Sequence, residues 1–83
     1  MASEIMLRHA IPVALAGVTF VAIHVHAPAG LPPTVSLGVV TDEEKDYDLR
    51  VGETFPVRGE TWVVDRVEDQ SSPGYRVFIR KAD

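Results

Sequence analysis

The chain has 83 residues, a length that predicts a single domain over residues 1–83 with a thin core. The residue pattern described below predicts that this is a β domain. The chain has no cysteine, which excludes disulfide scaffolds and thiolate metal sites and fits a reducing, cytoplasmic compartment. Its net charge is −4, and acidic residues are interleaved with the arginines of the C-terminal half, so we expect no nucleic-acid partner.

The apolar N-terminal stretch resembles a signal peptide in two respects. Arg8 precedes apolar residues 10–23, and Ala27-Pro28-Ala29 has the form of a small-residue cleavage site. However, Glu4 offsets Arg8, and residues 18–25 are β-branched and aromatic, which is typical of a strand. The stretch is also shorter than the roughly 20 apolar residues of a membrane span. We therefore expect neither a signal peptide nor a membrane association.

The first half of the chain alternates in a way that predicts three strands, over residues 4–9, 18–27 and 34–40. Pro12 interrupts the first strand, and residues 14–17 are ambiguous. In the second strand, strict alternation places Phe20, Ala22, His24 and His26 on one face. The proline-rich residues 28–33 then predict a stiff loop.

An acidic segment follows in the middle of the chain. Thr41-Asp42-Glu43-Glu44 has the form of a helix capping box, but no apolar helical period follows it, so it predicts at most one helical turn. Residues 42–48 otherwise predict a solvated acidic loop. Their spacing lacks the glycine and terminal glutamate of a calcium loop, so we expect no metal there.

The C-terminal half predicts further short strands. Alternation resumes over residues 47–51, and segments 54–57 and 60–68 flank Arg58-Gly59, a tight hairpin signal in which arginine is an unusual first residue. Residues 70–74 predict a second turn, and residues 75–81 the last strand. The whole pattern predicts an all-β fold, a small antiparallel barrel or sandwich of about six strands.

A pairing register can be drawn for the last three strands. It places Phe55 opposite Trp62, Val64 opposite Phe78, and Trp62 opposite Arg80. One sheet face is then apolar and edged by arginines; it holds Phe55, Trp62, Val64 and Phe78 with Arg66, Arg76 and Arg80. The other face is also apolar; it holds Val63, Val67, Tyr75, Val77 and Ile79, with Asp65 among them.

Two apolar faces on one hairpin exceed what a chain of this length can cover. Both faces of residues 18–25 are apolar as well, whereas a solvent-facing antiparallel sheet is polar on one side. Either loops cover the second face or another subunit does. We expect a homodimer, because large apolar patches on monomers usually mark an interaction surface.

His24 and His26 form the sharpest chemical motif. Two histidines at i and i+2 share a strand face and can converge on one metal or one substrate. The motif resembles the His-x-His of the cupin superfamily, which implies a metal site with a downstream carboxylate and a third histidine. No glutamate follows His26, and Trp62 stands where that histidine would lie. The alternative is that both histidines are exposed polar residues at a strand end, and we expect no bound metal.

A cofactor-free enzyme is the runner-up hypothesis. His24 and His26 would act as acid and base near neutral pH, with Asp65 as a carboxyl whose pKa would be raised if it were unpaired on an apolar face. The alternative is that Asp65 bonds an arginine or sits where the strand twists. Trp62 and Phe78 beside arginines could also stack single-stranded bases, but the acidic balance favours core packing.

Residues 49–67 carry a pattern of a Val-Gly-Glu step, a phenylalanine, a glycine turn and a tryptophan. This pattern resembles a small β-rich family of uncharacterised proteins from high-GC bacteria. The resemblance covers the C-terminal half of the chain and implies a fold and a bacterial source. It assigns no catalytic residue.

The sequence is thus best interpreted as a small non-catalytic binding or accessory module, acting as a homodimer through the apolar, arginine-edged face. The partner would be a protein or a small molecule, and no cofactor is expected. The predicted binding residues are Phe55, Trp62, Arg76, Phe78 and Arg80. An enzyme would instead need a concave pocket reached by His24 or His26.

Overall fold

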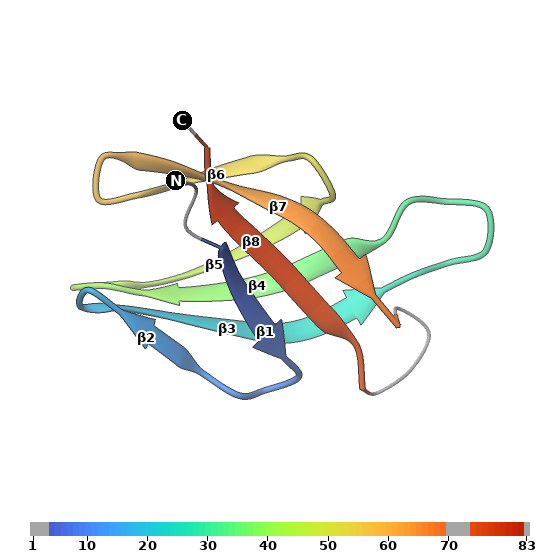
Figure 1. The fold of residues 1–83 in the computed structure, drawn as a ribbon, viewed down its shortest axis with the longest axis horizontal. Coiled ribbons are helices and arrows are strands. Elements are labelled where there is room, and N and C mark those ends of the chain that lie inside the picture. The colour runs from blue at the N-terminus through green and yellow to red at the C-terminus, as the bar shows by residue number, and fades with distance from the viewer. Residues whose placement is uncertain (1–3, 70–73, 83) are drawn as a thin grey trace.

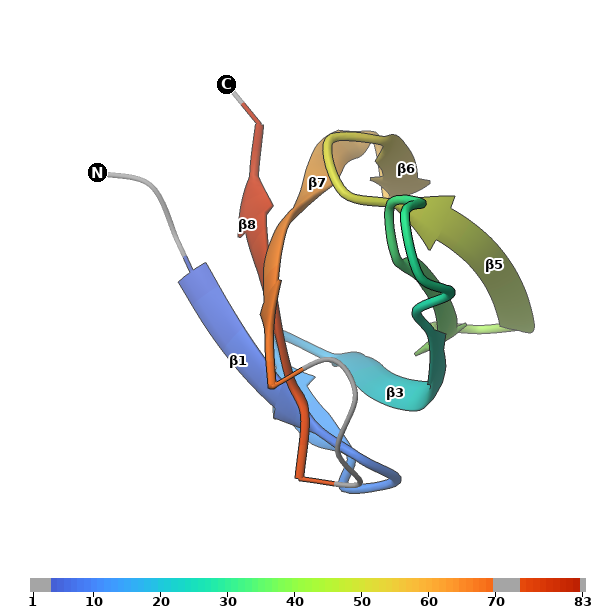
Figure 2. The same cartoon turned by 90° about the vertical axis from the view of Figure 1, so that its right-hand side faces the viewer.

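The computed structural model describes residues 4–69 and 74–82, which form strands and no helix (Figure 1). The strands make two antiparallel four-stranded sheets, with the orders β1-β8-β7-β6 and β2-β3-β4-β5. Figure 2 shows the β7–β8 layer facing β5 across the interior. The all-β prediction is confirmed, as a sandwich of two sheets. The strands are β1 (Glu4–Arg8), β2 (Val13–Leu15), β3 (Val18–His26), β4 (Thr34–Val40), β5 (Glu44–Arg50), β6 (Thr54–Val57), β7 (Glu60–Glu68) and β8 (Arg76–Lys81).

The described residues hold eight strands, so the expectation of about six is too low. The ambiguous segment after Pro12 forms β2, which pairs with β3 through a two-residue turn at Ala16-Gly17. Both turn residues have positive φ, 51° and 81°, which suits a type I′ hairpin. The hairpin at Arg58-Gly59 uses the same geometry, with φ of 48° and 80°. Arginine is thus tolerated at the first turn position because the glycine beside it and the paired strands hold the turn.

The acidic segment is a strand rather than a loop. Residues 41–43 make a bend in which the Thr41 N–H donates to the Glu43 carbonyl at 2.9 Å, and no helical turn forms. β5 then begins at Glu44 and pairs with β4 along its whole length. The prediction of a capped helical turn is wrong because β4 offers a complete row of backbone partners. The charged side chains of β5 are tolerated because β5 is the edge of its sheet.

A β-bulge in β3 changes which side chains face inward. The pairing with β4 shifts between Ala22 and His24, so Ile23 is the extra residue. Phe20 and Ala22 are buried before the shift, and Val25 is buried after it. Val25 therefore joins Phe20 and Ala22 in one core, although strict alternation placed it on the other face, while Ile23 stays exposed. The bulge accounts for the apolar residue at position 25 but not for the one at position 23.

A second bulge in β7 changes the predicted pairing with β8. Phe55 pairs with Trp62 as predicted, but Val64 lies opposite Ile79 and Trp62 opposite Lys81. The shift falls between Val64 and Arg66, so Asp65 is the extra residue. The register drawn from the sequence is wrong here because it assumed unbroken alternation.

The core lies between the two sheets and has a strong aromatic component. Phe20 of β3 packs against Trp62 of β7 with ring centroids 5.1 Å apart, and Tyr47 of β5 packs against Phe55 of β6 at 5.9 Å. Phe55 and Trp62 are 1% and 3% exposed. Burying such rings stabilises a small domain by about 1.5–3 kcal/mol each relative to leaving them in water.

The two ends of the sandwich are built differently. At one end, called here the hairpin end, the turns at Ala16-Gly17 and Arg58-Gly59 lie together, and Arg58 forms an ion pair with Asp42 at 3.7 Å. At the other, called here the loop end, β1 runs into residues 9–12 and β8 begins. There the Ala10 N–H donates to the Ala22 carbonyl at 2.9 Å, which ties the two sheets together.

Candidate functional site

The five predicted binding residues do not share one surface. Phe55 and Trp62 point into the core, because the β7 bulge leaves them on the inner face. Phe78 lies on the outer face of the β1-β8-β7-β6 sheet, with Arg76 and Arg80 two positions away on either side of it. Arg76, Phe78 and Arg80 therefore lie together on the outer face of the sheet. Phe55 and Trp62 lie on the opposite, inner face of the same sheet.

The outer face of this sheet is a network of ion pairs. The Arg66 guanidinium lies 3.8 Å from the centroid of the Phe78 ring, which is a cation–π contact. Arg66 also pairs with Asp65 at 2.7 Å and with Glu4 at 3.2 Å. Arg80 pairs with Asp65 at 3.0 Å. The face is thus charged and internally neutralised rather than apolar.

Asp65 is an ionised structural residue, not a carboxyl held neutral. Its hydrogen bond with Arg80, followed by that with Arg66, lowers the pKa of the Asp65 carboxyl below its ordinary value. The interpretation that Asp65 bonds an arginine at an irregularity of the strand is therefore the correct one. The raised pKa that the enzyme hypothesis required is absent because the β7 bulge turns this side chain to the arginine-rich outer face.

His24 and His26 lie on the outer face of the other sheet. Both are exposed, and Val25 between them is buried, so the two imidazoles share a face as predicted. His24 is level with Ser36 of β4, and the Ser36 hydroxyl donates to Asp48 at 2.7 Å. The structure does not bring these histidines to Asp65, which lies on the opposite outer face of the sandwich.

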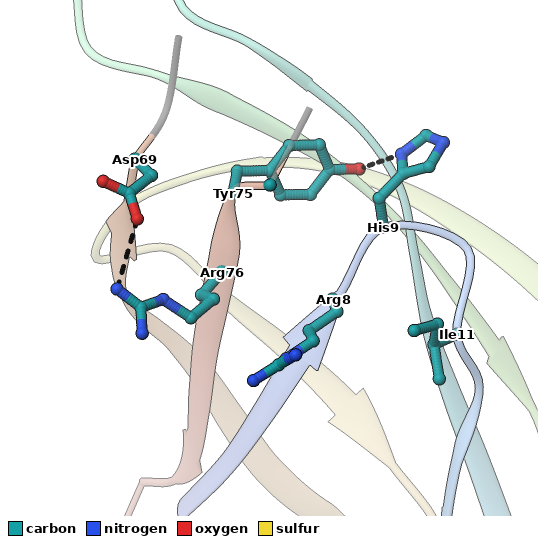
Figure 3. A pocket seen from close by; sticks show the side chains of 7 residues that line it. Arg8, His9, Ile11, Asp69, Tyr75 and Arg76 are labelled. Carbon is teal, nitrogen blue, oxygen red and sulfur yellow. Dashed lines mark hydrogen bonds and ion pairs between the residues drawn. The ribbon is translucent and has the colours of Figure 1, made fainter. Parts of the chain in front are cut away.

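A pocket of about 450 Å³ lies at the loop end (Figure 3). The residues that line it come from the end of β1, the loop after it, the position after β7, and the start of β8 with the two residues before it. They are Arg8, His9, Ile11, Asp69, Gly74, Tyr75 and Arg76.

One wall of this pocket contains a contact between His9 and Tyr75. The Tyr75 oxygen lies 2.7 Å from His9 Nδ1, and the two rings meet edge to face with centroids 5.5 Å apart. Tyr75 is 5% exposed, and burial raises the pKa of its hydroxyl. Tyr75 therefore stays neutral at physiological pH, and its hydroxyl donates to Nδ1 when the imidazole carries its proton on Nε2.

Two arginines stand beside this contact. Arg8 and Arg76 are directly opposite each other on β1 and β8, and Figure 3 shows both side chains on the same side of the sheet. Arg76 pairs with Glu68 at 3.1 Å and with Asp69 at 3.2 Å, yet its Nε is buried and has no hydrogen-bond partner among the described residues. Like charges directly opposite each other across a ladder repel, so an anion placed between them would be stabilised.

Little in the sequence points to this pocket. The sequence pattern assigns no role to His9, and it places Tyr75 only on the apolar face that holds Asp65. The signal was Pro12, which ends β1 and forces residues 9–12 to cross toward β3. The meeting of residues 9 and 75 could not be read from spacing because 66 positions separate them.

Two further searches concern metals and membranes. In the part of the chain that the structure describes, no three His, Asp or Glu side chains gather in a way that could hold a metal ion. Within residues 4–69 and 74–82, no helix is long and apolar enough to cross a bilayer.

A family model described as a family of unknown function, DUF6406, matches residues 2–83, so the chain belongs to this family. The match covers nearly the whole sequence, whereas the resemblance to an uncharacterised family drawn from residues 49–67 covered only the C-terminal half. Comparison with curated proteins gave no match, and comparison with solved structures gave none.

Proposed function

We propose that this member of the DUF6406 family is a non-catalytic binding module that holds a small anionic ligand in the loop-end pocket. The observation that carries the proposal is the cross-strand pair of Arg8 and Arg76, whose side chains lie on the same side of the sheet and line the pocket. A carboxylate or phosphate oxygen is the acceptor that such a pair favours. Of the binding residues predicted from the sequence, only Arg76 lines this pocket. Phe55 and Trp62 are buried, and Phe78 and Arg80 lie on the charged outer face of the sheet.

The charges around the pocket support selectivity for a small anion. Asp69 and Glu68 both pair with Nη2 of Arg76, so a ligand gains most from Arg8. Arg8 is exposed and forms no ion pair with any described residue. The neutral hydroxyl of Tyr75 and the ring of His9 form a wall that does not repel an anion.

Titration with inorganic phosphate and with acetate, followed by amide chemical shifts, tests the proposal. We expect saturable shifts confined to residues 8–11 and 74–76, and affinity for the favoured anion about tenfold weaker in Arg8→Ala, because a charged hydrogen bond is lost. Arg50→Ala is the matched control, since Arg50 is an exposed arginine on β5. Equal affinity of the two variants, or no saturable shift with either anion, would refute the proposal.

The acid–base enzyme hypothesis has less geometric support. It relied on His24, His26 and Asp65, and Asp65 is held ionised by two arginines on the other side of the sandwich. No specific observation favours turnover at the exposed histidines.

The homodimer stays a prediction. The bulges explain part of the alternation that suggested it, since Val25 is buried, and the remaining support is exposed apolar side chains such as Ile23 and Met6, which are 44% and 37% exposed. The solution mass measured by light scattering at several concentrations decides between a monomer and a dimer.

A further inference from the structure

The turn after β1 brings an apolar side chain to the arginine pair of the loop-end pocket. The Ile11 N–H donates to the Arg8 carbonyl at 3.2 Å, and Ala10 has a φ of 58°. Residues 8–11 thus form a turn with a positive φ at its third position, where a type II turn usually has glycine. Ile11 therefore returns toward Arg8 and lines the pocket, although it is 55% exposed (Figure 3).

The conformation of Ala10 is not explained by strand pairing. Ala16 and Arg58 also have positive φ, but both stand in two-residue hairpin turns that need this geometry. Ala10 stands in no such hairpin, and it lies between two residues that line the pocket. An alanine held in the left-handed region is strained, and strain of this kind gathers at ligand sites. The turn therefore holds Arg8 and Ile11 in a fixed relation at a cost in backbone energy.

The charges that line the pocket match one negative charge rather than two. They are the guanidinium groups of Arg8 and Arg76 and the carboxylate of Asp69. Asp69 pairs with Arg76 at 3.2 Å, whereas Arg8 forms no ion pair with any described residue. A monoanion balances Arg8, and a second negative charge would meet Asp69. A carboxylate therefore suits the pocket better than a phosphate group, which carries about −1.5 to −2 at neutral pH.

The volume of the pocket indicates that the anion carries a body. An engineered cavity of about 150 Å³ holds benzene, so a pocket of about 450 Å³ is much larger than acetate or phosphate needs. Ile11 offers this body an apolar side chain that water otherwise covers. The rings of His9 and Tyr75 add an uncharged wall. Apolar walls with a few placed polar groups are the usual lining of a small-molecule site.

We infer, on the basis of the proposed anion site, that its ligand is an organic monocarboxylate with a short apolar body, whose carboxylate pairs with Arg8 while the body packs on Ile11. Hexanoate is the probe, acetate is the control without the body, and adipate is the dicarboxylate of the same length. We expect hexanoate to bind roughly tenfold more tightly than acetate, because partly burying four more carbons is favourable, and at least about threefold more tightly than adipate. Amide chemical shifts of residues 8–11 and 74–76 at pH 7 measure the three affinities.

Two isoleucine variants test where the body packs. Ile11→Ser should lower the ratio of hexanoate to acetate affinity from roughly tenfold to about twofold. Ile23→Ser should keep the wild-type ratio, because Ile23 is a 44% exposed isoleucine on β3 that does not line the pocket.

The outcomes separate this inference from the anion site on which it rests. Saturable acetate binding with no gain for hexanoate would overturn the inference and leave the anion site standing. Adipate binding as tightly as hexanoate, or equal ratios in the two isoleucine variants, would overturn it in the same way. No saturable shift with any of the three carboxylates or with phosphate would contradict the proposed function itself.

Discussion

The loop end and the hairpin end of the sandwich treat a buried aromatic polar group in opposite ways. At the loop end, the Tyr75 hydroxyl has a partner in His9 at 2.7 Å, and the pocket beside it is broad and lined by charged groups. At the hairpin end, the Trp62 N–H has no partner among the described residues, and the cavity that Trp62 helps to line is small and mostly apolar. The difference teaches that one small fold can satisfy a buried polar group internally at one end and leave another unpaired at the other, at a cost of about 1–3 kcal/mol.

The largest effect is expected from removing the aromatic core of the hairpin end. Trp62→Ala should lower the free energy of unfolding by about 3–5 kcal/mol, because a buried ring packed against Phe20 is replaced by a cavity. Urea unfolding followed by circular dichroism measures it. Trp62→Phe should cost clearly less, since it keeps a ring and also removes the unpaired donor. A loss below about 1 kcal/mol in Trp62→Ala would show that the ring is not part of the core.

A smaller effect is expected at the loop end, and it depends on pH. Tyr75→Phe should cost about 1 kcal/mol near neutral pH because the hydrogen bond to His9 is lost. Burial raises the pKa of Tyr75 above its ordinary value of 10.0. The unfolded chain therefore ionises first, so the wild type should lose stability as pH rises above about 10, and Tyr75→Phe should lose less.

Urea unfolding of both proteins at pH 8 and at pH 10.5 measures this difference. Tyr47→Phe serves as the matched control, because Tyr47 is a half-buried tyrosine at the edge of the other sheet. If the wild type and Tyr75→Phe lost equal stability between pH 8 and pH 10.5, the prediction that burial of the Tyr75 hydroxyl makes stability depend on alkaline pH would be contradicted.

The smallest effect is expected outside both pockets, on the charged face. Asp65→Asn should lower stability by less than about 1 kcal/mol at pH 7, as is usual for a partly exposed ion pair. The bonds with Arg80 and Arg66 lower the pKa of Asp65, so their stabilisation is present above the unfolded value of 3.8 and is lost as pH falls through the folded pKa. The variant and the wild type should therefore converge near pH 2.

Thermal unfolding at pH 7 and pH 2 measures the convergence. Asp46→Asn is the control, because Asp46 is an exposed carboxylate on β5. A gap between the wild type and Asp65→Asn that is as large at pH 2 as at pH 7 would mean that the aspartate charge contributes nothing.

Much of the fold could be predicted from alternation and turns. The bounds of β4, β6 and β7 match the predicted segments, and the hairpin at Arg58-Gly59 is where the dipeptide placed it. The predicted turn over residues 70–74 lies largely outside the described residues. β2 was missed because three residues are too few to show a period, and its turn at Ala16-Gly17 needs a positive φ at an alanine, for which the sequence carries little signal.

The bulges were the main obstacle to predicting the site. One extra residue at Ile23 and one at Asp65 reverse the inward and outward positions that follow them, and nothing in the local composition marks either place. The placement of Trp62 with Phe78 on one face failed for this reason. The loop-end pocket depends instead on tertiary contacts between β1 and β8, which sequence spacing does not report.

The charged edge strand β5 has a consequence for how copies of this chain can meet. Glu44, Asp46 and Asp48 alternate along it, so two copies aligned edge to edge through β5 would bring like charges together. At the edge of the other sheet, β6 is short and carries Pro56, which lacks an N–H to donate. Neither β5 nor β6 is therefore a favourable template for a continuous intermolecular sheet. Where copies of the chain meet through these two strands, the contact should be built from side chains on a sheet face rather than from backbone pairing.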